Sequence, residues 1–158
     1  ASSIIESHDI LADKISQFSV EGAVVFGPAS LQAEWMEQEI SETSEDTGLS
    51  TATTYSGNYV LASYFLTGEF REYKKGSFSG VKPNRESGAW ELVVRRSNIE
   101  LDDLANTVTA DTVSVGVNYY ATGRVRFMLA AAKSDVEGPD AEKSGKAESV
   151  QFRAQYVF

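Results

Sequence analysis

The sequence contains no cysteine, one histidine and only three prolines among its 158 residues. The absence of cysteine excludes disulfide frameworks, thiolate metal sites and cysteine nucleophiles. His8 alone cannot supply a Ser–His–Asp triad or a histidine-rich metal site, and we expect it to be an exposed polar residue. No apolar run approaches the 18 or so residues that a membrane-spanning helix needs. We therefore expect no enzyme, no catalytic residues, and neither a metal nor a cofactor.

Basic residues are also scarce, because 14 Lys and Arg stand against 23 Asp and Glu, which gives a net charge of −9. A nucleic-acid partner is excluded on this ground, since binding it requires a concentrated basic surface. The chain is 42% hydrophobic and contains 2 Trp, 7 Tyr, 8 Phe and 12 Gly. This composition fits a transmembrane β-barrel, and it fits a soluble all-β domain equally well. Composition alone leaves both classes open.

Apolar and polar side chains alternate from about residue 14 to the C-terminus, which is the period of a β-strand. We expect one domain over residues 1–158, with a loop or short helix over 1–13. Gly27–Pro28 and Thr122–Gly123 are predicted to be tight turns, because glycine and proline favour them. Polar loops are expected at 42–54, 69–87 and 137–147. The seven predicted strands cover about residues 14–26, 30–41, 55–68, 88–101, 110–121, 124–136 and 147–158.

The predicted strands have 11–14 residues, which is longer than is typical of globular sheets and long enough to cross a bilayer at a tilt. One face of each strand is apolar and carries aromatic residues near its ends, whereas the other face is polar throughout. This pattern favours a transmembrane antiparallel up-and-down barrel over a soluble or cell-surface β-sandwich that acts as a binding module. We expect the membrane-interface and assembly residues to be Trp90, Tyr119, Phe152, Tyr156 and Phe158.

The same alternation predicts which side chains face water and which face lipid. The seven predicted pore-lining residues are Arg95, Arg126, Arg153, Glu91, Asn118, Gln151 and Gln155. The predicted lipid-facing residues are Val113, Val115, Val117, Phe127, Leu129, Phe152 and Tyr156. Guanidinium groups bind oxyanions in bidentate geometry, so arginines in a lumen can set a preference for anions. Alternatively, the arginines pair with Glu91 or with other neighbours and only fill the lumen.

Six segments carry a resemblance to a known family: YVLASYFLTGEFREY at 59–73, GSF at 76–78, VKP at 81–83, GAWELVVR at 88–95, NYYATGRVRFML at 118–129 and VQFRAQYVF at 150–158. These segments are similar to the phosphate-selective porin O and P family. The resemblance implies the C-terminal portion of a trimeric, about 16-stranded porin of the Gram-negative outer membrane that passes small anions such as phosphate by passive diffusion. Seven strands cannot close such a wall, so further strands are expected to complete it.

The final strand adds a second resemblance. It ends on Phe158, like the terminal strands of bacterial outer-membrane proteins, whose last aromatic residue is read by the barrel-assembly machinery. The partners implied are that machinery, outer-membrane lipid and lipopolysaccharide, a homotrimer and permeating anions.

Overall fold

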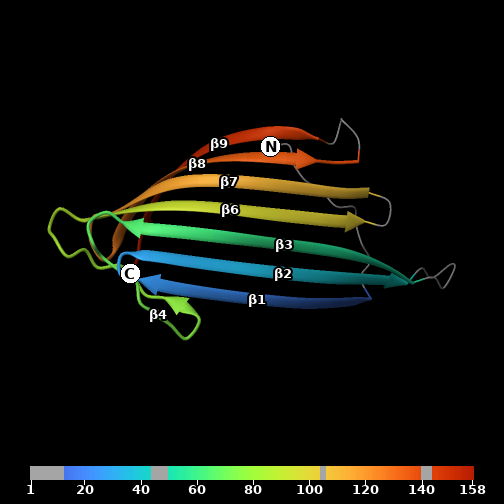
Figure 1. Ribbon diagram of the computed structural model, residues 1–158, viewed down its shortest axis with the longest axis horizontal. Helices are drawn as coiled ribbons and strands as arrows, with labels where there is room; N and C mark the ends of the chain where they lie inside the picture. The colour runs from blue at the N-terminus through green and yellow to red at the C-terminus, as the bar shows by residue number, and fades with distance from the viewer. Residues whose placement is uncertain (1–12, 44–49, 104–105, 140–143) are drawn as a thin grey trace.

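The computed structural model describes residues 13–43, 50–103, 106–139 and 144–158. They form one antiparallel sheet of seven long strands in the order β1-β2-β3-β6-β7-β8-β9, together with a separate two-stranded hairpin, β4-β5 (Figure 1). The long strands are β1 (Lys14–Phe26), β2 (Ala29–Thr43), β3 (Ser50–Phe65), β6 (Ala89–Asp103), β7 (Asn106–Tyr120), β8 (Val125–Glu137) and β9 (Gly145–Tyr156). The hairpin strands are β4 (Tyr73–Lys74) and β5 (Ser77–Phe78). The expected all-β, up-and-down antiparallel fold is confirmed.

Each long strand pairs with the next long strand along the chain, so β1 and β9 form the two edges of the sheet. The turn between β1 and β2 has two residues, and Gly27 adopts a φ of 55° that favours glycine. The turn between β7 and β8 is closed by Thr122, whose hydroxyl oxygen accepts hydrogen bonds from the N–H groups of Arg124 and Val125, both at 3.1 Å. Both expected turns are therefore present.

The two ends of the sheet carry different connections. Residues 27–28, 66–88 and 121–124 connect strands at one end, where the C-terminus also lies (Figure 1). We call this the turn end. The strand ends at Thr43, Ser50, Asp103, Asn106, Glu137 and Gly145 lie at the opposite end of the sheet, as expected for alternating antiparallel strands.

The largest differences from the sequence prediction lie in β3, in β7 and in the connection 66–88. β3 begins at Ser50 and β7 at Asn106, each earlier than expected. Apart from Ala52 and Val108 these extensions consist of Ser, Thr and Asn, so backbone pairing continues where side-chain alternation gives no signal. The connection 66–88, predicted as a plain loop, contains the β4-β5 hairpin. The expectation for residues 1–13 lies outside the described residues, apart from Asp13.

The register separates the side chains of the sheet onto two faces, because residues paired across strands point the same way. One face carries Arg95, Arg126 and Arg153, and we call it the arginine face. The other carries Trp90, Tyr119, Phe152 and Tyr156, and we call it the aromatic face.

Burial on these two faces is the reverse of that in a soluble protein. The buried cluster of Phe65, Val81, Ala89 and Tyr120 lies at the turn end of the arginine face, where the connection 66–88 covers it. Large apolar side chains of the aromatic face stay exposed, with Phe18 at 61%, Val115 at 53% and Phe152 at 70%. Among the described residues, no helix is long and apolar enough to cross a membrane.

Candidate functional site

All seven predicted pore-lining residues lie on the arginine face. Glu91 pairs with Asn118 across β6 and β7, and Arg126 pairs with Gln155 across β8 and β9. The other three are placed by the same ladders, which pair Leu61 with Arg95, Met128 with Arg153 and Ala130 with Gln151. All seven predicted lipid-facing residues lie on the aromatic face.

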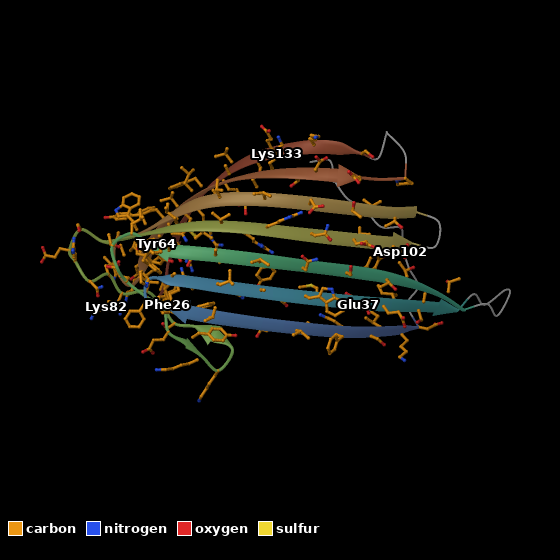
Figure 2. All side chains as sticks on the ribbon, viewed as in Figure 1. Phe26, Glu37, Tyr64, Lys82, Asp102 and Lys133 are labelled. Carbon is orange, nitrogen blue, oxygen red and sulfur yellow. The ribbon has the colours of Figure 1, made fainter. Side chains whose placement is uncertain are left out.

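The aromatic face has an apolar band that starts at the turn end. Phe26 and Tyr64 lie at the turn end, whereas Glu37, Asp102 and Lys133 lie farther along the strands (Figure 2). The band covers nine residues in β1, from Phe18 to Phe26, and seven in β7, from Val113 to Tyr119, which are eight and six steps along the strand. At 3.3–3.4 Å per residue this is about 20–27 Å along the strands. In a barrel whose strands tilt by about 40°, this length corresponds to a height of about 15–21 Å, compared with the apolar band about 25 Å tall of outer-membrane barrels.

Aromatic rings form a connected row at the turn end of this band. Trp90 and Tyr119 pack with their ring centroids 4.6 Å apart, and Tyr119 stacks with Phe127 at 6.5 Å. Phe127 in turn stacks with Phe152 at 6.4 Å. Phe158 follows the end of β9 and is fully exposed. The row has the position of the aromatic girdle that lies at the membrane–water interface in barrels.

Charged side chains border the band on its other side. Arg96 and Asp111 approach to 3.4 Å, Lys133 and Glu148 to 3.7 Å, and Lys146 and Asp135 to 3.0 Å. These pairs are exposed, so they contribute little to stability. These ion pairs lie where the side chains of the aromatic face change from apolar to charged.

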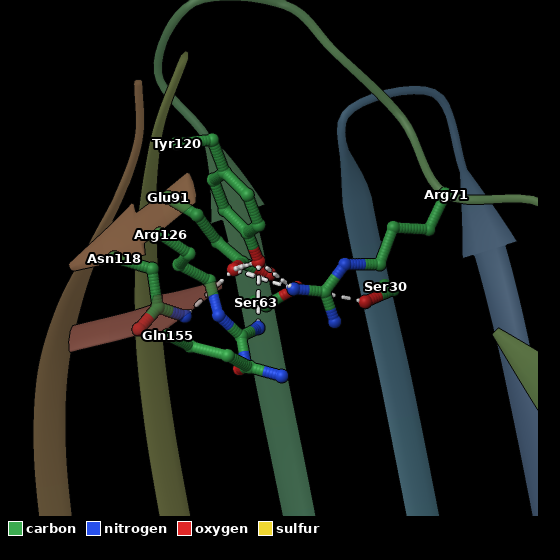
Figure 3. Close-up of polar contacts among 8 residues, drawn as sticks. All are labelled: Ser30, Ser63, Arg71, Glu91, Asn118, Tyr120, Arg126 and Gln155. Atoms are coloured by element: carbon green, nitrogen blue, oxygen red, sulfur yellow. Dashed lines mark hydrogen bonds and ion pairs between the residues drawn. The ribbon is translucent and has the colours of Figure 1, made fainter. Parts of the chain in front are cut away.

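Glu91 is the centre of a polar network at the turn end of the arginine face (Figure 3). One carboxylate oxygen, Oε2, accepts hydrogen bonds from Arg71 at 2.7 Å, from the Tyr120 hydroxyl at 2.8 Å and from Asn118 at 2.8 Å. The other oxygen, Oε1, has no partner among the described residues. Arg71 also donates to the Tyr120 hydroxyl. The network therefore ties the connection 66–88 to β6 and β7.

The position of Glu91 corrects one expectation. Glu91 was predicted to line the pore, but its side chain is 0% exposed, because the covering connection seals it from solvent. Its partner, Arg71, was not identified from the sequence. Arg71 lies in an irregular segment 20 residues before Glu91, where no strand alternation assigns a direction to its side chain.

Arg126 is held in place by neutral groups. Its guanidinium donates to the Tyr120 hydroxyl at 3.2 Å and to Oε1 of Gln155 at 2.8 Å. It also lies 5.4 Å from the centroid of the Tyr120 ring. Because these partners are uncharged, they orient the guanidinium without neutralising it.

Arg95 and Arg153 are exposed on the arginine face. The guanidinium of Arg95 lies 4.5 Å from the centroid of the Tyr59 ring, which is within cation–π range. Glu21 and Glu34 face each other across β1 and β2 on this same face, so the acidic side chains gather toward the β1 edge. Positive charge therefore gathers on β6, β8 and β9.

Glu69 fixes the path of the connection. Its Oε1 accepts a hydrogen bond from the N–H of Asn84 at 2.9 Å, and its Oε2 accepts one from the Thr67 hydroxyl. The Thr67 oxygen in turn accepts the N–H of Trp90 at 3.0 Å. Burial alone would raise the pKa of Glu69, but the hydrogen bonds from Thr67 and Asn84 stabilise the carboxylate, and the net pKa is lowered.

Comparison with known proteins connects this geometry to a family. The family described as phosphate-selective porin O and P matches residues 2–158. Porin O of Pseudomonas aeruginosa is 33% identical over 160 aligned residues, which cover 90% of this chain and 35% of Porin O. An uncharacterized protein of Caulobacter vibrioides is 34% identical over 93 residues, which cover 54% of this chain and 17% of that protein.

This chain thus spans about a third of the length of Porin O. The match nevertheless extends over almost the whole chain, and the resemblance seen in the sequence segments is confirmed. The chain belongs to the phosphate-selective porin O and P family, and its location is the bacterial outer membrane.

Proposed function

We propose that this chain forms part of the wall of a passive diffusion channel for small anions such as phosphate. The arginine face lines the water-filled lumen, and the aromatic face contacts lipid. The observation that carries the proposal is the exposed apolar band of the aromatic face, which lies opposite a polar and charged face across all six strand pairings. Family membership points in the same direction, to a channel rather than an enzyme.

A soluble β-sandwich, the alternative considered above, agrees less well with the burial pattern. A sandwich buries its apolar face against a second sheet, whereas here the charged face holds the buried cluster and the apolar face is exposed. An exposed apolar surface of this extent is typical of contact with a membrane or a partner.

The two edges of the sheet indicate that further strands are needed to complete a barrel. β1 and β9 each have one unpaired side within the described sheet. Unpaired backbone groups are not tolerated in the hydrocarbon layer, so strands outside this chain must complete the barrel. A porin of about 16 strands that assembles as a trimer, is inserted by the barrel-assembly machinery, and contacts lipopolysaccharide at its outer leaflet would meet this requirement.

The test is anion preference in planar-bilayer recordings of the full-length porin that contains this chain. At an effective dielectric constant near 20, a unit charge about 8 Å from a permeating ion contributes about 2 kcal/mol. Physiological salt reduces this by roughly threefold, so three arginines together contribute about 2 kcal/mol. That energy corresponds to a permeability ratio of tenfold or more.

The triple variant Arg95→Gln, Arg126→Gln, Arg153→Gln should therefore lose most of its anion preference in a salt gradient. Lys82→Gln, at an exposed position of the connection, removes one charge outside this set and serves as the control. Reversal potentials of the triple variant that equal those of the wild type would refute the role of these arginines.

A further inference from the structure

The apolar band of the aromatic face ends differently on the two sides of the sheet. We call the border of the band away from the turn end the far border. On β1 and β2 it holds Phe18 and Trp35, whose ring centroids are 6.0 Å apart. Walls of barrels that contact lipid carry aromatic belts at both borders of the band. On β6 to β9 the described residues of the far border include no aromatic side chain and are charged instead, so a different neighbour is expected there.

The charged side chains of this part form a row directly beyond the band. The register places Arg96, Val113, Lys133 and Glu148 side by side across β6, β7, β8 and β9. Arg96 lies 3.4 Å from Asp111, and Lys133 lies 3.7 Å from Glu148. These distances are long for hydrogen bonds, and an ammonium has three donors and a guanidinium five. Both cations therefore keep donors for a ligand.

The band is hollowed directly below this row. A recess of about 470 Å³ reaches Lys133 at the far border, and a second recess of about 420 Å³ extends toward the turn end. Both are lined by Val115, Ala131 and Val150, so they form one groove. The register places Ala131 between Val115 and Val150, and its short side chain leaves the hollow. From Leu129 to Lys133 the groove extends over four strand steps, which is about 13 Å.

We propose that this groove holds an acyl chain of a phosphorylated glycolipid, the lipid A part of lipopolysaccharide, with one lipid phosphate on Lys133. Arg96 lies in the same row two strands away, which is about 10 Å, and can bind a second phosphate of the same headgroup. The proposal rests on the proposed function, because it takes the aromatic face to be in lipid and the far border to be in the outer leaflet. It adds a defined site to the lipopolysaccharide contact proposed above.

The exposure of the row favours a glycolipid over a second copy of this chain. The side chains of Lys133 and Glu148 are 62% and 77% exposed. A second copy packed over the groove would bury these charges, and the desolvation of buried ion pairs is costly. A phosphorylated sugar headgroup covers the same row and leaves it in contact with water.

The experiment titrates lipid A into the full-length porin in detergent micelles and counts bound lipid by native mass spectrometry. Lys133→Gln should raise the concentration for half-occupancy by at least about tenfold, because a charge-assisted hydrogen bond is lost. Ala131→Phe fills the groove without changing any charge and should have a similar effect. Lys14→Gln, at an exposed position of the same face on β1, removes one charge away from the groove and should change nothing. Lipid A without its phosphates should bind the wild type at least about tenfold more weakly.

Three results would overturn the proposal. The first is half-occupancy at the wild-type concentration in both Lys133→Gln and Ala131→Phe. The second is an equal rise in Lys14→Gln, since a diffuse charge effect would then suffice. The third is loss of the oligomer on unheated gels in Ala131→Phe with unchanged lipid A binding in Lys133→Gln, which would make the groove an interface between copies.

Failure of this proposal is distinguishable from failure of the proposed function. Lys133 and Ala131 lie on the aromatic face, so their variants should keep the reversal potentials of the wild type. A negative lipid A titration therefore leaves the test of the triple arginine variant unaffected. Unchanged reversal potentials in the triple variant would in turn leave the lipid A titration to decide the groove.

Discussion

The Glu91–Arg71 pair should control whether the connection 66–88 stays on the arginine face. Glu91→Gln keeps the shape of the side chain and removes its charge. Arg71 would then lose the carboxylate that lies 2.7 Å from its guanidinium. The Glu91 side chain is 0% exposed and the Arg71 side chain is 19% exposed. Removing one partner of a buried pair typically costs about 3–5 kcal/mol. We expect about 3 kcal/mol here, since Arg71 keeps some contact with solvent.

A double-mutant cycle isolates this energy. Glu91→Gln, Arg71→Gln and the double variant would be compared by urea unfolding of the full-length porin in lipid vesicles, followed by tryptophan fluorescence. The double variant should be destabilised by much less than the sum of the single variants. Glu72→Gln, which breaks an exposed pair with Lys74, is the control and should leave the unfolding midpoint nearly unchanged. Additive single effects would refute the role of the pair.

Three further predictions concern the turn end. Gly88→Ala should destabilise the porin by about 1–3 kcal/mol in the same unfolding assay. The reason is that the φ of Gly88 is 79° and that a new Cβ would lie 2.6 Å from the Tyr119 ring and from the Tyr120 carbonyl oxygen. Gly80→Ala is the control and should not destabilise the porin, because the space around Gly80 is open. Glu69 has a lowered pKa, so its stabilising effect should be complete above its ordinary value of 4.5 and be lost as the pH falls through the lower folded value; an acid-unfolding profile unaltered by Glu69→Gln would contradict this. Deleting Phe158 should reduce insertion into the outer membrane far more than synthesis, measured by membrane fractionation, and equal losses of both would contradict an assembly role.

Much of the sheet could be predicted from the sequence, because the period of two survives wherever one face meets an apolar medium. β1 was predicted at its observed bounds, and Gly27–Pro28 at its observed turn. The strand ends near Ser50 and Asn106 were missed, since one apolar residue in each stretch, Ala52 or Val108, makes no alternating pattern and pairing alone extends the strand. The sequence therefore predicts the strands within the apolar band better than the parts beyond it.

The covering connection could not be predicted in the same way. Arg71 reaches Glu91 and Tyr120 only because the chain folds back over the sheet, and such contacts between distant residues leave no periodic signal. This is why Glu91 was expected to be in water and is instead buried. The face to which a strand side chain points follows from the alternation along the strand, whereas its exposure depends on whether another segment of the chain covers that face.

The most direct test of the account is the accessibility of four consecutive residues in β9. The chain has no cysteine, so single cysteines can be placed at Val150, Gln151, Phe152 and Arg153 without background labelling from this segment. In the porin embedded in lipid vesicles, a charged, membrane-impermeant thiol reagent should label positions 151 and 153 and spare 150 and 152. Equal labelling at all four positions, or the opposite alternation, would contradict the assignment of the arginine face to the lumen and the aromatic face to lipid.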